Sequence, residues 1–291
     1  MHWLYDLPLL VLSLGFVLGC ALLGIGGVLL ARRSGWTVSP EDNGTAAALH
    51  AFVGVVYAVA LGLMVVSVQE DYGDVEQAVV TEANAAGDLF RSMEALEPPA
   101  RSRLQAMLAR YVSLVVTEEW PASRHGRRSD TTWRAIDQLA RAIDTFQPAT
   151  PAEERMLPDL VTDSDALLDA RRMRLFLGQQ GIGAVTWLVI VVGGIVTLGF
   201  ACCFYMERPR TQLLLTGLMG GMLGLMLFLV VAMDHPLWGR LSVKPDAFLE
   251  LRTNFEHMRR ERGDPAFGAA AAAPDPRLLA APADSPRQRD P

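Results

Sequence analysis

The stretch VVSVQEDYGDVEQAVVTEANAAGDLF, residues 65–90, joins an apolar run to an acidic one with no proline between them. Its first residues end an apolar run that begins at Ala46, and Glu70, Asp71 and Asp74 follow directly. A helix that leaves a bilayer and continues in water has this pattern. The segment therefore predicts one long helix with a membrane part and an extramembrane part.

Three other segments of the chain are as apolar as the one before Val68. A helix needs roughly 20 apolar residues to cross a hydrocarbon core of about 30 Å. The four runs that meet this length, without any Asp, Glu, Lys or Arg, are Leu7–Ala31, Ala46–Val68, Ile182–Met206 and Leu213–Met233. The first is longer than the core of a typical signal peptide and follows no basic residue, so we expect a retained span. The sequence predicts an all-α integral membrane protein with four transmembrane helices and a helical extramembrane domain between the second and third.

This topology divides the chain into five segments. We expect two spans with their loop, a helical neck domain, two further spans, a membrane-proximal segment with an amphipathic helix, and a disordered tail; their ranges are 1–68, 69–181, 182–233, 234–262 and 263–291. Basic residues near the span ends are more numerous on the side of the termini, which favours a cytoplasmic location for the termini and the neck. The formal net charge of −6 gives no basic footprint for nucleic acid.

Helical periodicity continues through the extramembrane residues. Apolar and small residues follow a 4-3 heptad spacing at Tyr72, Val75, Val79, Ala86, Leu89, Met93 and Leu96. A second helix is expected over residues 101–119, closed by Trp120-Pro121, and a third around Trp133. A fourth begins at Thr150, where Glu153 completes a capping box. Asp246 is placed to cap a short amphipathic helix.

Glu82 occupies the remaining seam position of this heptad. A carboxylate in a helix seam is costly unless it is paired or neutral. We expect an arginine from residues 101–110 or 171–174 to pair with it in a buried ion pair. The alternative is a shallow seam in which Glu82 stays exposed to water.

No catalytic or metal-binding motif occurs in the sequence. The five histidines have no ligand spacing, and we expect no enzyme activity, cofactor or metal site. The adjacent acids Glu118-Glu119 and Glu153-Glu154 are interpreted as solvated carboxylates at helix ends. The three cysteines lie inside predicted spans, where they are typical of small packing residues.

Small residues are spaced four apart in three of the spans. The pairs Gly15/Gly19, Gly217/Gly221 and Gly220/Gly224 permit close helix packing, within one chain or between copies. In the second span, small residues share one stripe with a histidine: Ala46, His50, Gly54, Ala58 and Gly62. The stripe could line a water-filled path with His50 as its titratable group, or form a contact ridge with another helix. Both interpretations remain open at this point.

The acids after the second span lie where a ring of carboxylates would surround a channel mouth. Glu70, Asp71 and Asp74 fall within a turn or so of the membrane exit. Rings of Asp or Glu favour cations and disfavour anions. The alternative is that polar residues simply begin where the bilayer ends.

Several short motifs, in order between the four spans, resemble the bestrophin-like membrane family. They are Asn43 at the start of the second span, Glu82-Ala83, EEWP at 118–121, the Arg171-Arg172 region and DHPLWG at 234–239. The resemblance covers roughly residues 43–248. Bestrophins are pentameric anion channels with four spans, cytoplasmic termini and a pore surrounded by the second spans.

This resemblance implies topology, a homo-oligomer and ion conduction, with two departures from the bestrophin pattern. The element after the last span reads Pro236-Leu237-Trp238-Gly239, without the expected phenylalanine, and the acidic calcium-clasp run is missing. Calcium gating and anion selectivity are therefore not implied.

We expect a homo-oligomer, pentameric as in bestrophins, in the cell (inner) membrane, passing small inorganic ions along the second spans. Its path residues would be His50, Gly54, Ala58, Gly62, Glu70, Asp71 and Asp74. The alternative is a non-conducting scaffold or sensor that binds a partner through the Trp120/Trp133 region or the C-terminal helix.

Overall fold

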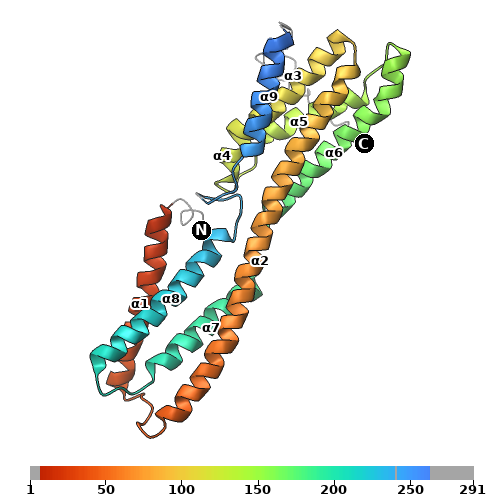
Figure 1. Ribbon diagram of the computed structural model, residues 1–291. Helices are drawn as coiled ribbons and strands as arrows, with labels where there is room; N and C mark the ends of the chain where they lie inside the picture. Colours follow the sequence, from red (N-terminus) through yellow and green to blue (C-terminus); the bar gives the residue numbers. More distant parts are fainter. Residues whose placement is uncertain (1–6, 240, 263–291) are drawn as a thin grey trace, which may run out of the picture. The chain divides into compact units, whose positions relative to one another are not determined.

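A computed structural model describes residues 7–239 and 241–262 of the chain. The predicted tail at 263–291 lies outside these residues. Four helices are long and apolar enough to cross a membrane: α1 (Leu9–Ser34), α2 (Asn43–Ser92), α7 (Ala184–Cys202) and α8 (Pro209–Met233). They coincide with the four predicted spans, and no strand occurs in the described part of the chain. The protein is all-helical (Figure 1).

The remaining helices follow the predicted order. A 3₁₀ turn, Met93–Ala95, ends α2, and the other elements are α3 (Pro98–Leu114), a π-helical turn (Val115–Glu119), α4 (Trp120–Ser123), α5 (Asp130–Asp144), α6 (Pro151–Leu177) and α9 (Asp246–Arg262). Trp120-Pro121 was expected to close a helix, and this expectation is wrong. The helix instead continues from the π-helical turn without a break, and Pro121 lies within α4, which ends at Ser123.

The chain divides into two compact units, and α2 and α6 each contribute residues to both. The first unit comprises Met1–Thr81, Glu119–Ser129 and Ala170–Pro245. The second comprises Glu82–Glu118, Asp130–Asp169 and Asp246–Pro291. The five-segment division expected from the sequence stays a prediction.

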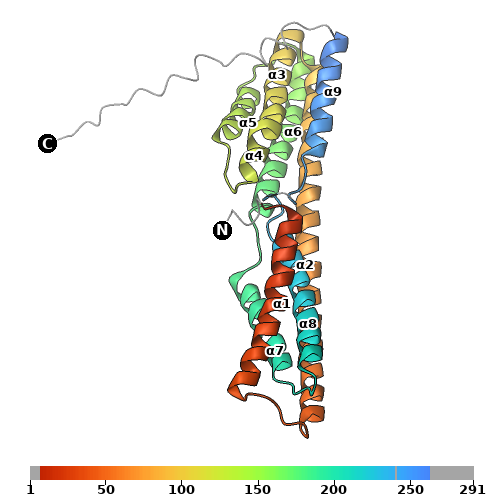
Figure 2. The same cartoon turned by 90° about the vertical axis from the view of Figure 1, so that its left-hand side faces the viewer.

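In the first unit, α1 and α8 cross at two glycines (Figures 1 and 2). A Cβ atom at Gly220 would lie 2.4 Å from the carbonyl oxygen of Cys20, and one at Gly224 would lie 2.3 Å from that of Phe16. The backbones of the two helices are therefore in direct contact, as the small-residue spacing predicts. At Gly15 and Gly19 a Cβ would meet no atom within 4 Å, so this pair makes no close helix contact within the chain.

The span part of α2 packs on α7 and α8 through one apolar cluster. Leu61, Ile190 and Val230 are its buried members, at 7%, 1% and 1% exposure. The hydroxyl of Tyr57 donates a hydrogen bond to the carbonyl of Ile190 at 2.9 Å. The ring of Tyr57 lies over Gly193, where a Cβ would stand 2.4 Å from it. A larger residue at Gly193 would displace this ring.

The second unit is a helical bundle in which α3 packs against α5 and α9 (Figure 2). The predicted heptad seam is buried along α2, and Ala86, Leu89 and Met93 are completely covered. Helix α9 buries the apolar face expected from its sequence: Phe255 stacks on Phe90 of α2 with ring centroids 4.2 Å apart. This face of α9 is thus occupied by the chain itself.

The start of α6 carries the predicted cap with one difference. The hydroxyl of Thr150 accepts a hydrogen bond from the Glu153 amide at 3.2 Å. The difference is that the carboxylate of Glu153 accepts not only from the Thr150 amide, as in a capping box, but also from the amides of Ala149 at 2.7 Å and Glu97 at 3.0 Å. These bonds, the Glu97 amide foremost, lower the pKa of Glu153. The carboxylate joins the start of α6 to the start of α3 and is buried, not solvated as predicted.

Candidate functional site

The small residues of the predicted path leave one side of α2 open within the chain. A Cβ added at Gly54 or Gly62 would meet no atom within 4 Å, and Ala58 is exposed. The adjoining side of this helix carries Tyr57 and Leu61, which face α7 and α8. The open side of α2 is therefore available to water, lipid or another copy of the chain.

His50, the titratable member of the same stripe, is in contact with α7 and the residues that follow it. Its ring stacks on Phe200 with centroids 5.4 Å apart and an interplanar angle of 13°. Phe204 approaches it edge-on, at 5.5 Å and 74°. At this position the contact-ridge interpretation describes the observed packing, while Ala58 and Gly62 are exposed, as a path requires, and Gly54 is half-buried.

The loop after α7 is tied to the start of α2 by Asn43. Its side-chain amide donates to the carbonyl of Tyr205 at 2.8 Å, and its oxygen accepts from the Tyr205 amide at 3.3 Å. The Asn43 side chain thus bonds both backbone polar groups of Tyr205, as a residue of a paired strand would. This explains the role of an asparagine at the opening of this span: it holds the loop whose Phe204 contacts His50.

The acids at the membrane exit of α2 are solvated. Glu70, Asp71 and Asp74 are all exposed, and none belongs to a group of three or more potential metal ligands among the described residues. Their placement suits the mouth of a channel or the wet surface of a long helix.

Glu82 is fully buried in the second unit. The alternative interpretation, a shallow seam in which Glu82 stays exposed to water, is therefore wrong. The hydroxyl of Tyr111, on α3, donates a hydrogen bond to its carboxylate. Tyr111 is itself completely covered. The ion pair between Glu82 and an arginine stays a prediction.

A buried ionic cluster that sequence reasoning missed lies in the first unit. Arg171 of α6 forms two hydrogen bonds to the carboxylate of Glu119, at 3.1 and 2.6 Å, and Arg174 adds a third at 2.5 Å. The three side chains are 2%, 2% and 0% exposed in the order Arg171, Glu119 and Arg174. Glu119 was expected to be solvated, and this is wrong. Its neighbour Glu118 is exposed, since adjacent helical residues point about 100° apart.

The electrostatics of Glu119 follow from this geometry. Burial raises the pKa of its carboxyl group, but the guanidinium groups of Arg174 and Arg171 lower it by more. The net result is a pKa below the ordinary value of 4.5, and Glu119 is an anion at neutral pH.

The segment after α8 is joined to the same cluster by Trp120. Its indole lies 5.2 Å from the guanidinium carbon of Arg174, and its N–H donates to the carbonyl of Val243 at 2.9 Å. Arg124 donates to the carbonyl of Gly239 at 3.0 Å. Residues 119–124 therefore hold the chain that leaves the last span.

DHPLWG, residues 234–239, also fixes the chain that enters α7. Asp234 accepts a hydrogen bond from the Ile182 amide at 2.5 Å. Leu237 lies over Gly178, and His235 lies over Gly181, positions where a Cβ would approach these side chains to 2.1 and 2.4 Å. EEWP, the Arg171 region and DHPLWG thus converge in space. The sequence shows these three motifs and their order, but it does not show that they contact one another in the folded chain.

A model of the Bestrophin-like domain matches residues 15–248, which is most of the chain. The chain belongs to the Bestrophin-like family. No curated protein sequence matches it.

Two solved structures share the fold of this Bestrophin-like chain. Both are single-substitution variants of a bacterial bestrophin homologue from Klebsiella pneumoniae. One matches with a TM-score of 0.62 at 13% identity, covering 84% of this chain and 98% of the other. The second matches with a TM-score of 0.56 at 12% identity, covering 84% and 97%. At such low identity the likeness establishes the fold.

The surfaces proposed for a scaffold function of this Bestrophin-like chain differ in accessibility. Trp120 is 5% exposed and bonded to Val243, and Phe248 and Phe255 of α9 are buried. Trp133 on α5 is 53% exposed. Of the predicted docking residues, Trp133 has an accessible ring.

Proposed function

We propose that this chain is one subunit of a homo-oligomeric ion channel whose path is lined by the α2 helices. Membership of the Bestrophin-like family and the fold shared with a bacterial bestrophin homologue support this proposal. The observation that carries it furthest is the open side of α2. A Cβ atom at Gly54 or Gly62 would meet no atom within 4 Å, whereas the nearby Tyr57 and Leu61 of α2 pack on α7 and α8.

Several copies arranged around this side would enclose a path with small residues along its wall. Glu70, Asp71 and Asp74 would then form rings at one mouth of this path, where α2 leaves the membrane. Rings of carboxylates favour cations over anions. Bestrophins favour anions, so the acids and the family resemblance point to opposite selectivities. The proposal therefore leaves the choice between cations and anions to the flux measurement.

The test is ion flux through purified protein in liposomes. Gradients of KCl, potassium gluconate and N-methylglucamine chloride separate cation from anion movement. Flux should fall strongly in Gly62→Phe, which narrows the path. Leu14→Phe, at a position of α1 that is 57% exposed, is the matched control and should conduct normally. Absence of flux under every gradient would contradict the proposal, as would a monomer or a tight dimer in lipid nanodiscs.

We place the protein in the cell (inner) membrane with its termini and neck helices in the cytoplasm. Reporter fusions at the C-terminus test this orientation: a cytoplasmic fluorescent reporter should be active and a periplasmic phosphatase reporter inactive. The reverse pattern would invert the topology without affecting conduction.

A non-conducting scaffold is the second candidate, and the exposed Trp133 favours it. A scaffold would lose partner binding in Trp133→Ala, whereas a channel would keep its flux. The two measurements on one variant separate the two functions.

A further inference from the structure

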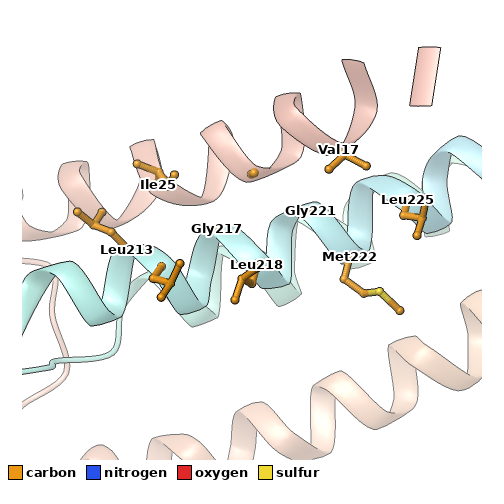
Figure 3. Close-up of a pocket in the computed structure, with 10 residues that line it drawn as sticks. Val17, Ile25, Leu213, Gly217, Leu218, Gly221, Met222 and Leu225 are labelled. Carbon is orange, nitrogen blue, oxygen red and sulfur yellow. The ribbon is translucent and has the colours of Figure 1, made fainter. Parts of the chain in front are cut away.

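An apolar groove of about 510 Å³ runs between α1 and α8 in the first unit. Its floor contains Gly217 and Gly221, and its walls include Val17 and Ile25 of α1 and Met222 of α8 (Figure 3). Both helices qualify as membrane spans, so the groove opens toward the hydrocarbon of a bilayer. Such a groove is filled by an acyl chain or by another helix.

The length of the groove along the two helices is close to the thickness of one leaflet. On α1 it extends from Val17 to Ile25, a rise of about 12 Å at roughly 1.5 Å per residue. On α8 it extends from Leu213 to Leu225, about 18 Å by the same rise. Half of a hydrocarbon core of ~30 Å is about 15 Å. One acyl chain of a bilayer lipid therefore has the length to lie along it.

One end of the groove carries basic side chains on both of its walls. Arg32 follows Ile25 by seven residues, on the same face of α1, and Arg33 is next to it at the edge of that face. Arg210 precedes Gly217 by seven residues, on the same face of α8. Because α1 and α8 run in opposite directions, these arginines lie at the same end (Figure 1).

The positive charges of these arginines are accessible to an anionic ligand or are bonded only to neutral acceptors. Arg33 and Arg210 are exposed. Arg32 is fixed by neutral acceptors: Gln212 Oε1, at 2.9 and 2.6 Å from its Nε and Nη2, and the carbonyl of Met206 at 2.6 Å. The neighbouring loops also carry the exposed acids Glu41, Asp42 and Glu207, and neither these acids nor the arginines line the groove itself.

We propose that this groove binds an anionic phospholipid, with one acyl chain over Gly217 and Gly221 and the phosphate against Arg33 and Arg210. The exposed basic side chains at one end of an apolar groove match the anionic headgroup and the acyl chain of such a lipid. A second copy of the chain is the alternative that the test below separates. The exposed ring of Trp36, at 78% exposure after the end of α1, is typical of a residue at the headgroup level. The proposal does not depend on conduction.

The test is native mass spectrometry of the full chain in detergent with phosphatidylglycerol or phosphatidylcholine of identical acyl chains. The wild type should retain phosphatidylglycerol in preference. Arg33→Gln and Arg210→Gln should each reduce that preference by about fivefold, the effect of one basic residue near a charged surface, and leave phosphatidylcholine unchanged. Arg134→Gln on α5 is an exposed control and should retain the preference.

Filling the groove tests the acyl-chain half of the proposal. Gly221→Leu should reduce retention of both lipids with all arginines intact, since a Cβ there makes only an ordinary contact of 3.5 Å with Val17. Gly26→Leu, which adds the same side chain at an exposed position of α1 that does not line the groove, should leave retention unchanged. Met222→Trp, at a position 57% exposed, fills the groove by a second route if Gly221→Leu fails to fold.

Three results would overturn the proposal. They are equal retention of the two lipids by the wild type, undiminished phosphatidylglycerol in the double arginine variant, and a change of subunit number in Gly221→Leu. The last would assign the groove to a contact between copies. The first two results do not bear on whether the protein conducts ions, whereas a change of subunit number would also concern the assembly that the proposed channel requires.

Discussion

The hydroxyl of Tyr111 donates a hydrogen bond to the carboxylate of Glu82, and both side chains are completely buried. A buried carboxylate that loses a donor keeps its desolvation penalty. Tyr111→Phe should therefore lower the free energy of unfolding by about 1–3 kcal/mol. Thermal melting of the detergent-solubilised protein measures this. Tyr205→Phe, at an exposed ring, is the control and should stay within about 0.5 kcal/mol of the wild type.

Glu119 is the common partner of two buried arginines, Arg171 and Arg174. Glu119→Gln leaves both guanidinium groups buried without their anion and should destabilise the protein by about 3–5 kcal/mol. Asp137→Asn removes an exposed carboxylate paired with Arg141 and should cost about 0–1 kcal/mol. Chemical denaturation of both variants gives the comparison. Equal losses in the two variants would show that burial of the Glu119 cluster adds nothing.

The same cluster predicts a direction of pH dependence. The pKa of Glu119 in the folded protein lies below its ordinary 4.5, because Arg174 and Arg171 outweigh the effect of burial. Its stabilisation is therefore fully present above pH 4.5 and is lost as the pH falls toward the lowered pKa. The melting-temperature gap between wild type and Glu119→Gln should be constant from pH 7 to 5 and narrow below 4.5. A gap that widens on acidification would reverse the sign.

The helices could be predicted from the sequence because their signals are local. Runs of apolar residues located all four spans, and the heptad spacing located the buried seam through Ala86, Leu89 and Met93. Thr150 marked the start of α6 because a cap bonds within its own first turn. Each of these signals is carried by residues close together in the chain.

The contacts of the acids could not be predicted because they join distant residues. Glu119 and Arg171 are 52 positions apart, and no periodicity relates them. Either member of Glu118-Glu119 could have faced the interior, and only the packing of α6 selects Glu119. The π-helical turn at Val115–Glu119, which ends at Glu119, has no sequence signal either.

The glycines of the spans should respond differently to substitution by alanine. Gly220→Ala and Gly224→Ala would place a Cβ against the backbone of α1, at 2.4 and 2.3 Å from carbonyl oxygens, and should destabilise by about 1–3 kcal/mol. Gly15→Ala meets open space and should be neutral, or stabilising by up to about 1 kcal/mol through helix propensity. Melting temperatures in detergent test the contrast. Equal effects at Gly220 and Gly15 would contradict the α1–α8 crossing.

The acids at the exit of α2 should influence ion flux without influencing stability. Glu70, Asp71 and Asp74 are exposed, so replacing all three with their amides should change the free energy of unfolding by no more than about 0.5 kcal/mol for each residue. If they ring a channel mouth, the triple variant should lower the ratio of cation to anion permeability, because the local negative potential is removed. Reversal potentials in asymmetric KCl measure that ratio. The control is Glu94→Gln, in the 3₁₀ turn Met93–Ala95 that follows α2. This variant removes one charge 20 residues along the chain from Asp74. An unchanged reversal potential in the triple variant would place these acids outside the path and leave them as the solvated surface of a long helix.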